Sequence, residues 1–210
     1  MMMMKKLFTL ILILASVTIQ AQNITLPAPA KKGGSSTIES LWKRHSVRSF
    51  QQKNLPMQTL SNLLWATTGL NRKDGKRTNP TAMNKQEISL YAFMKKGVYL
   101  YDHKNHTLIL KKEGDHRNLV ANGQNFVNDA PISLVVVGDL SLFPNSSSSD
   151  VMTTVGIDAG IACENINIFC ASAGLATVPR ITMDKAGIKK LLNLSDKQIP
   201  FINNPVGFEK

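Results

Sequence analysis

The chain has 210 residues, of which 43% are hydrophobic, and this is enough for one well-packed domain. Its 25 lysines and arginines outnumber 14 acidic residues, and the formal net charge of +11 favours anionic partners. The basic residues are scattered without interleaved aromatic residues, which argues against a nucleic-acid-binding protein and leaves a phosphate-bearing small ligand as the better match.

Residues 1–21 have the pattern of a secretory signal peptide. Lys5 and Lys6 form a basic start, residues 7–17 form an apolar stretch too short to span a membrane, and Ala21 offers a cleavage point. We therefore expect an exported, periplasmic protein that keeps no stable membrane span after cleavage. An uncleaved N-terminal membrane anchor is the alternative.

The mature chain begins with a stretch rich in proline, lysine, glycine and serine. We predict an extended, weakly ordered arm over residues 22–36 and one folded domain over residues 37–210. Ser36 and Glu39 form a capping box, which predicts a short helix that ends near Arg44.

The elements that follow alternate irregularly between helix and strand, which predicts an α+β fold. The patterns predict a helix from Pro56 to Gly69, strands over residues 89–95, 98–101 and 107–111, a helix from Asp115 to Asp129, a buried strand over residues 132–138, a helix over residues 184–194 and a terminal strand over residues 201–208. Pro205 suits an edge position for that last strand.

The longest predicted element is a helix over residues 150–175, which a preceding serine run can cap and Gly174 ends. Apolar residues recur along it at three- and four-residue steps, and the opposite side carries Ile157, Ile161 and Ile168. A helix of this kind is buried around most of its circumference. We predict that it packs on the sheet and on a second subunit; a core helix of a monomer is the alternative.

Few side chains suggest chemistry of their own. Cys163 and Cys170 lie seven residues apart on one helix, about 10.5 Å, which is too far for a disulfide, so we interpret both as buried apolar residues. His103 and His106 fall in a predicted hairpin turn, where solvent exposure is the simplest interpretation, and neither Asp139 nor Asp158 has an evident partner. We predict no catalytic side chain and no metal site.

The densest polar cluster is Arg44-His45-Ser46-Val47-Arg48-Ser49-Phe50. Two guanidinium groups with a hydroxyl between them could hold a phosphate through charge-assisted hydrogen bonds. Basic residues near a helix C-terminus also complement the helix dipole, so both interpretations stay open.

Two further segments are candidates for ligand contact. Residues 80–86 bring the amides of Asn84 and Gln86, which suit the polar edge of a flat heterocycle, although a polar turn explains them as well. Residues 174–181 lead from a helix stop into an extended segment, whose backbone N–H groups could face a ligand at the sheet edge.

Together the three clusters resemble the nitroreductase family of FMN-dependent oxidoreductases. The R-x-S-x-R pattern at Arg44, Ser46 and Arg48 is similar to the family's phosphate and ribityl motif, and P-[ST]-x-x-N-x-Q over residues 80–86 is similar to its isoalloxazine motif. The run over residues 171–179 is similar to its C-terminal A-x-A-G-L-x-[ST]-V-P motif. The motifs agree in order and spacing over nearly the whole mature chain.

The resemblance implies an α+β homodimer with a central, mainly antiparallel sheet flanked by helices, the long helix at the subunit interface and two FMN sites built from both subunits. It implies an FMN-dependent oxidoreductase that passes a hydride from NAD(P)H or another donor through flavin N5 to a small aromatic, nitro or quinone-like acceptor. The cofactor-binding residues that it implies, with their neighbours, are Arg44, His45, Ser46, Arg48, Thr81, Met83, Asn84, Gln86, Pro179, Arg180, Ile181 and Lys210.

The sequence departs from the family pattern in three places. Many members extend past the last strand and return a Lys or Arg to the phosphate, a role that only Lys210 could fill here. Ile181 and Thr182 stand where members often have Gly, and Glu87-Ile88 replaces a frequent Trp. These last positions face the substrate side, so the acceptor is left open.

Two other function classes remain. One is an exported flavin-binding module without NAD(P)H-dependent turnover, because NAD(P)H is scarce outside the cytoplasm. The other is a basic structural or interaction protein that has lost the cofactor. A visible flavin spectrum, and its bleaching by NAD(P)H, would separate the three.

Overall fold

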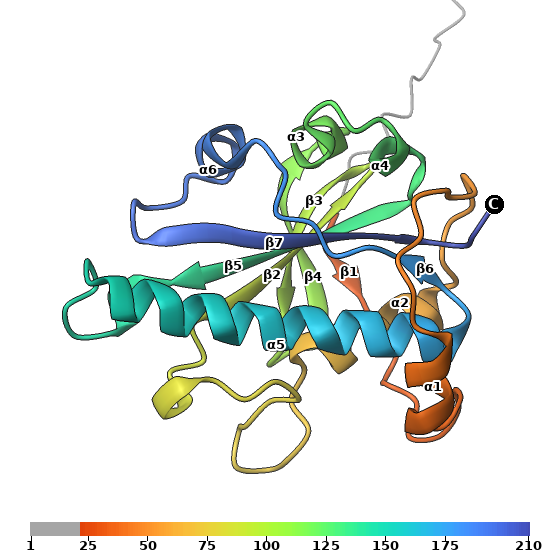
Figure 1. Ribbon diagram of the computed structural model, residues 1–210, viewed down its shortest axis with the longest axis horizontal. Helices are drawn as coiled ribbons and strands as arrows, with labels where there is room; N and C mark the ends of the chain where they lie inside the picture. Colours follow the sequence, from red (N-terminus) through yellow and green to blue (C-terminus); the bar gives the residue numbers. More distant parts are fainter. Residues whose placement is uncertain (1–21) are drawn as a thin grey trace, which may run out of the picture.

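The computed structural model describes residues 22–210, and the predicted signal peptide, residues 1–21, lies outside the described part. A seven-stranded sheet forms the centre, in the order β1-β4-β3-β2-β5-β7-β6, and each neighbouring pair is antiparallel (Figure 1). The strands are β1 (Ile24–Thr25), β2 (Ile88–Met94), β3 (Gly97–Asp102), β4 (Thr107–Glu113), β5 (Ile132–Asp139), β6 (Ala176–Thr177) and β7 (Gln198–Gly207). The α-helices are α1 (Thr37–Lys43), α2 (Met57–Thr68), α3 (Arg117–Ala121), α4 (Phe126–Asp129), α5 (Ser149–Ala173) and α6 (Lys185–Leu192), and the 3-10 turns are η1 (Ala82–Asn84) and η2 (Leu140–Leu142). This arrangement confirms the predicted α+β class.

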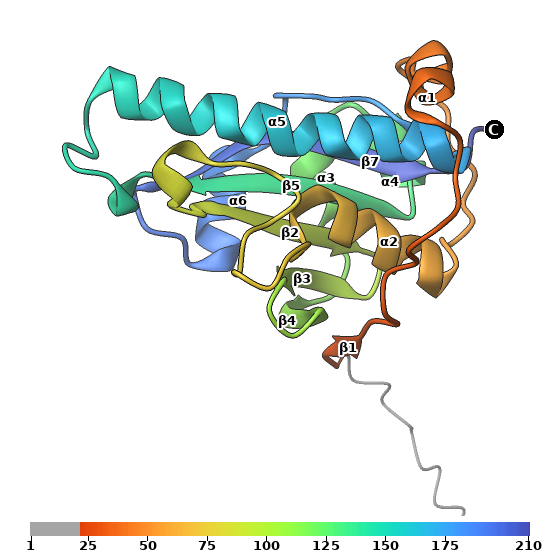
Figure 2. The ribbon, with the colours of Figure 1, turned by 90° about the horizontal axis from the view of Figure 1, so that it is seen from below.

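Helices cover both faces of the sheet, with α2 and α5 on one face and α3, α4 and α6 on the other (Figures 1 and 2). Side chains of β2 alternate between the two faces: Leu90 and Ala92 enter the core beneath α2 and α5, whereas Tyr91 and Phe93 enter the core beneath α3 and α6. The neighbouring β5 alternates in the same way and is buried along residues 132–138. The predicted buried central strand is therefore confirmed.

The long helix α5 begins and ends at the expected signals. Ser148 caps it by accepting the N–H of Val151, and Gly174 stops it in the left-handed conformation at φ 67°. One side packs on the sheet and α2 through Val155, Ala159, Ala162, Ile166 and Cys170. The other side is open in a single subunit, since Ile157 is 60% exposed and a Cβ built on Gly160 would meet nothing within 4 Å.

The two cysteines of α5 are buried and unbridged, as predicted. Burial raises the pKa of the Cys163 thiol to about 12 and raises that of Cys170 as well, so both stay protonated and behave as small apolar groups. Within residues 22–210, no helix combines the length and the apolar character needed to cross a membrane.

The predicted single helix from Asp115 to Asp129 is wrong, because the structure divides it into α3 and α4. Asn122 and Gly123 adopt left-handed backbone angles, with φ of 43° and 84°, and end α3. These are the two residue types that enter this region at least cost, and the apolar pattern continues across the break. The carboxylate of Asp115 pairs with Arg117 at 2.6 Å.

The predicted edge position of the terminal strand is also wrong. β7 lies between β5 and β6. The outer side of β7 is covered in pieces, by the two-residue β6 at Val206 and Gly207 and by a bridge between Arg180 and Asn203. Pro205 falls between these contacts, where its missing N–H interrupts little.

The N-terminal arm and the predicted turn histidines are more ordered than expected. β1 pairs with β4, so the arm forms an edge strand of the sheet. The imidazole Nε2 of His106 lies 2.7 Å from Ser61 Oγ and 3.0 Å from the carbonyl of Pro27, which ties the arm to α2. His103 is half-buried as well, and burial lowers its pKa to about 4. The prediction that both histidines are solvated is therefore wrong.

Candidate functional site

The first and third polar clusters lie together at the C-terminal end of α5. The backbone N–H of Val47 donates to the carbonyl of Thr177 at 3.0 Å, which joins the segment after α1 to β6. The N–H of Lys210 donates to the carbonyl of Ser49 at 3.3 Å, which brings the last residue to the same surface. Three segments far apart in the sequence thus form one surface.

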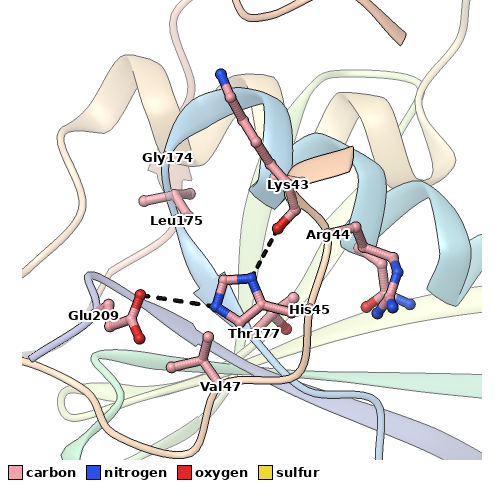
Figure 3. Close-up of a pocket in the computed structure, with 10 residues that line it drawn as sticks. Lys43, Arg44, His45, Val47, Gly174, Leu175, Thr177 and Glu209 are labelled. Carbon is pink, nitrogen blue, oxygen red and sulfur yellow. Dashed lines mark hydrogen bonds and ion pairs between the residues drawn. The ribbon is translucent and has the colours of Figure 1, made fainter. Parts of the chain in front are cut away.

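A hollow of about 170 Å³ opens on this surface (Figure 3). It is lined by Lys43, Arg44, His45, Val47, Asn167, Ala171, Gly174, Leu175, Thr177 and Glu209. The Nδ1–H of His45 donates to the carbonyl of Lys43 at 2.8 Å, which leaves Nε2 directed at the carboxylate of Glu209, 4.0 Å away. The side chains of Lys43 and Arg44 point away from this pair (Figure 3).

Of the residues expected to bind a phosphate, Arg44 lines this hollow, and Ser46 and Arg48 follow it in the same segment. Arg44, Ser46 and Arg48 are exposed, and within residues 22–210 neither arginine forms an ion pair. Burial, followed by repulsion from the Arg48 guanidinium, lowers the pKa of the Arg180 guanidinium. An anion bound here would relieve this local excess of positive charge.

Buried amides hold the third cluster in place. Asn204 of β7 donates to Asn167 Oδ1 at 2.9 Å and to Thr177 Oγ1 at 3.1 Å, and it accepts the Cys163 thiol at 3.0 Å. A buried polar group left unpaired costs about 1–3 kcal/mol, so these bonds fix β6 against α5. The sequence analysis missed Asn204, although the adjacent Asn203 and Asn204 within an otherwise apolar strand were an available signal.

Arg180 plays a structural part. The residue is 7% exposed, and its guanidinium donates four hydrogen bonds inside the fold, to Gln124, Val120, Ala121 and Asn203. Its backbone N–H and carbonyl both pair with Asn203. Its side chain is committed to the fold, whereas the neighbouring Pro179 is half-buried and Ile181 is 72% exposed.

The second cluster occupies a loop with three left-handed residues. Met83, Asn84 and Gln86 have φ of 52°, 50° and 52°. Asn tolerates this conformation, but for Met and Gln it costs about 1–3 kcal/mol each, a kind of strain that gathers at binding sites. Met83 is 71% exposed, and Asn84 is exposed beside it, so both side chains are free to meet a ligand or a partner.

The other predicted residues of this loop shape it from within. The amide of Gln86 donates to the carbonyl of Gly75 at 3.0 Å and accepts the Arg77 guanidinium at 3.1 Å. The hydroxyl of Thr81 accepts the backbone N–H of Gln86 at 2.9 Å. Thr81 and Gln86 therefore hold the loop conformation that presents Asn84.

Two carboxyl groups lie behind this loop: Glu87, which was expected to face the substrate side but is buried, and Asp158, which was expected to have no partner. Asp158 Oδ2 accepts the backbone N–H of Ala82 at 2.8 Å, which ties the loop to α5 and corrects the expectation that Asp158 has no partner. Glu87 is 2% exposed, and burial, followed by the neighbouring Asp158 carboxyl, raises the pKa of Glu87 to about 7. An acid directly after the N-x-Q pattern, and an acid among the apolar residues of the long helix, were the available signals.

Asp139 likewise has partners that the sequence analysis did not find. Its carboxylate accepts the backbone N–H of Ser141 at 2.9 Å and caps η2. The amide of Gln198 donates to the same carboxyl group at 3.3 Å. These contacts give Asp139 a local structural role.

One subunit does not gather all the predicted cofactor residues into one site. The 81–86 loop meets α5 at Asp158, whereas the first and third clusters meet it at residues 171–175. Thirteen residues of helix correspond to about 20 Å. In Figure 1 the turn η1 and the helix α1 lie toward opposite ends of α5.

Comparison with known proteins identifies relatives of this chain. A model of the nitroreductase family matches residues 41–207. A protein of Methanocaldococcus jannaschii named as a candidate nitroreductase is 28% identical over 176 residues, which cover 80% of this chain and 88% of the relative.

Solved structures are similar as well. A candidate nitroreductase from Ralstonia eutropha JMP134 is 34% identical, with 92% of each chain covered and a TM-score of 0.84. A candidate NADH oxidase from Clostridium acetobutylicum, 21% identical over 83% of this chain and 88% of its own, shares the fold with a TM-score of 0.57. The chain therefore belongs to the nitroreductase family, whose members are flavin-type oxidoreductases.

Proposed function

We propose that the protein is an exported, homodimeric FMN-dependent oxidoreductase. It takes a hydride from NAD(P)H or another reduced donor and delivers it to a small aromatic, nitro or quinone-like acceptor. Family membership supports the reaction class. The pattern of residues 1–21 supports export to the periplasm.

The separation of the predicted cofactor residues along α5 is the observation that carries the proposal. A flavin that touches both the 81–86 loop and the Arg44–Arg48 segment needs these to come from different chains. The open side of α5, with Ile157 and Gly160, offers the surface on which a second copy can pack. Two antiparallel copies of α5 would bring the 81–86 loop of one chain toward the hollow beside Arg44 of the other chain. The interface between the two chains would bury about 2,000 Å² or more.

The residues present fit FMN. Arg44 and Arg48 would hold the phosphate with charge-assisted hydrogen bonds. Lys210 would join them, because its backbone N–H is hydrogen-bonded to Ser49 in the same segment. The exposed amide of Asn84, supplied by the other chain, would pair with the polar edge of the ring. When bound, FMN supplies the redox chemistry, and the protein positions it and limits access to its face.

The test is purification of residues 22–210, a visible spectrum, and anaerobic titration with NADH, NADPH and dithionite. The proposal expects a yellow dimer whose flavin absorbance bleaches with at least one physiological donor. A yellow protein that only dithionite reduces would instead indicate a flavin-binding module without NAD(P)H turnover. A colourless protein that cannot be reconstituted with FMN would contradict the proposal.

A further inference from the structure

A pair of buried carboxyl groups supports the 81–86 loop from below. We propose that Glu87 and Asp158 share a single proton and act together as positioning residues that hold the 81–86 loop in place for the flavin. Neither residue touches the cofactor. The inference rests on the proposed function to the extent that FMN is the ligand of this loop.

Asp158 is the anchor that attaches the loop to the body of the protein. The loop is shaped internally by the Asn84 N–H, which donates to the carbonyl of Thr81 at 3.0 Å, and by the Gln86 N–H, which donates to the Thr81 hydroxyl. These bonds stay within the loop, whereas the bond from Ala82 N–H to Asp158 crosses to α5. Removal of the Asp158 carboxylate would leave the internal conformation of the loop unchanged but would loosen its attachment to α5.

Glu87 is the group that holds Asp158. Both oxygens of Glu87 are buried, and neither makes a well-formed hydrogen bond within residues 22–210, although the Asp158 carboxyl and the Thr81 hydroxyl lie close to the Glu87 carboxyl. Two ionised carboxylates can only accept and repel each other. One proton on Glu87 removes the conflict, because its O–H then donates to Asp158 while Asp158 Oδ2 accepts from Ala82.

The charged groups around the pair leave this arrangement in place. Arg77, from the loop before η1, attracts Glu87, but its guanidinium is hydrogen-bonded to Gln86 and to the carbonyl of Ile88 at 2.7 Å. Thr81 offers Glu87 a hydroxyl, and Tyr101 and His103 lie near Arg77. The arrangement is thus one shared proton and one net negative charge beside one buried cation.

The consequence is a loop whose position depends on pH near neutrality. When the shared proton leaves, two buried carboxylates face each other, and Asp158 can no longer keep its geometry toward Ala82. The loop then loosens and Asn84 loses its fixed position. Replacement of either acid by its amide should remove this dependence, because an amide NH2 replaces the shared proton.

Amide hydrogen exchange in the flavin-free protein tests the pair without any cofactor. We expect the protection factor of the Ala82 N–H to fall at least tenfold between pH 6 and pH 9 in the wild type. In Glu87→Gln and in Asp158→Asn it should stay high at both pH values, and in Asp158→Ala it should be low at both. A wild-type protection factor that does not change with pH, or that Asp158→Ala leaves intact, would overturn the shared proton.

FMN binding tests the consequence for the loop. Asp158→Ala should weaken FMN binding at least tenfold at pH 6, and Glu87→Gln should bind FMN more tightly than the wild type at pH 9. Asp196→Asn is the matched control, because Asp196 is exposed in the turn between α6 and β7, and it should follow the wild type. If the wild type binds FMN and all variants bind it with the same affinity, the positioning role is contradicted. Wild-type protein that never binds FMN would instead contradict the proposed function, and the exchange measurement would still decide the shared proton.

Discussion

The backbone N–H of Lys210 donates to the carbonyl of Ser49 at 3.3 Å, and this places the last residue of the chain directly beside Arg48. The R-x-S-x-R segment and Lys210 are therefore neighbours, although strands β2 to β7 lie between them in the sequence. On this basis we expect the Lys210 side chain to contribute to the surface where a phosphate would bind.

Arg48→Ala should lower the affinity for FMN by about 10- to 100-fold, because a lost charge-assisted contact is worth about 1.5–3 kcal/mol. Fluorescence titration of the flavin-free protein measures this. Lys104→Ala is a suitable control, because Lys104 lies in the exposed turn between β3 and β4 and its replacement also removes one positive charge. Equal FMN affinity in both variants would show that Arg48 is merely a surface cation.

Asn84→Ala should leave the fold intact and change the environment of the flavin ring. The exposed Asn84 amide supports little of the core, whereas a polar group of the ring left unpaired costs about 1–3 kcal/mol. The absorption spectrum and the reduction potential of the bound flavin should both shift. If both stay as in the wild type while FMN remains bound, Asn84 is only a turn residue.

Gly160→Leu should weaken dimerisation and release FMN together. The position is open within one subunit, so a larger side chain there would overpack a contact with a partner by about 1–3 kcal/mol. Analytical ultracentrifugation at micromolar concentration reports the oligomeric state. Ala186→Leu on the exposed side of α6 is the control and should remain dimeric. A wild-type monomer that keeps its flavin would contradict the shared site.

Glu87→Gln should stabilise the protein at pH 8 but not at pH 4. The pKa of Glu87 is raised to about 7 in the folded protein, against about 4.3 when unfolded, so its ionisation opposes folding. That cost is absent below the unfolded pKa, grows as the pH rises from about 4 to 7, and levels off above pH 7 at about 3–4 kcal/mol. Urea unfolding at both pH values measures the difference. If the difference in unfolding free energy between Glu87→Gln and the wild type is the same at pH 4 and pH 8, this account is contradicted.

Local signals explain what could be predicted from the sequence. The cap at Ser36, the stop at Gly174 and the apolar run of β5 depend on neighbouring residues, and all three are confirmed. The break at Asn122 was missed because the apolar pattern runs through it, and the interior position of β7 depends on a two-residue partner strand. Pairings between distant segments, such as Glu87 with Asp158 or His106 with Ser61, arise only once the sheet and helices are assembled.

The central claim is that each FMN site takes Arg48 from one chain and Asn84 from the other. Co-expression of differently tagged Arg48→Ala and Asn84→Ala chains, followed by isolation of the mixed dimer, tests it directly. If the claim holds, one site of the mixed dimer keeps both residues, and FMN titration shows one site of wild-type affinity and one doubly weakened site. Two altered sites, one lacking only Arg48 and the other lacking only Asn84, with no site of wild-type affinity, would place both residues in the same chain's site and contradict the account.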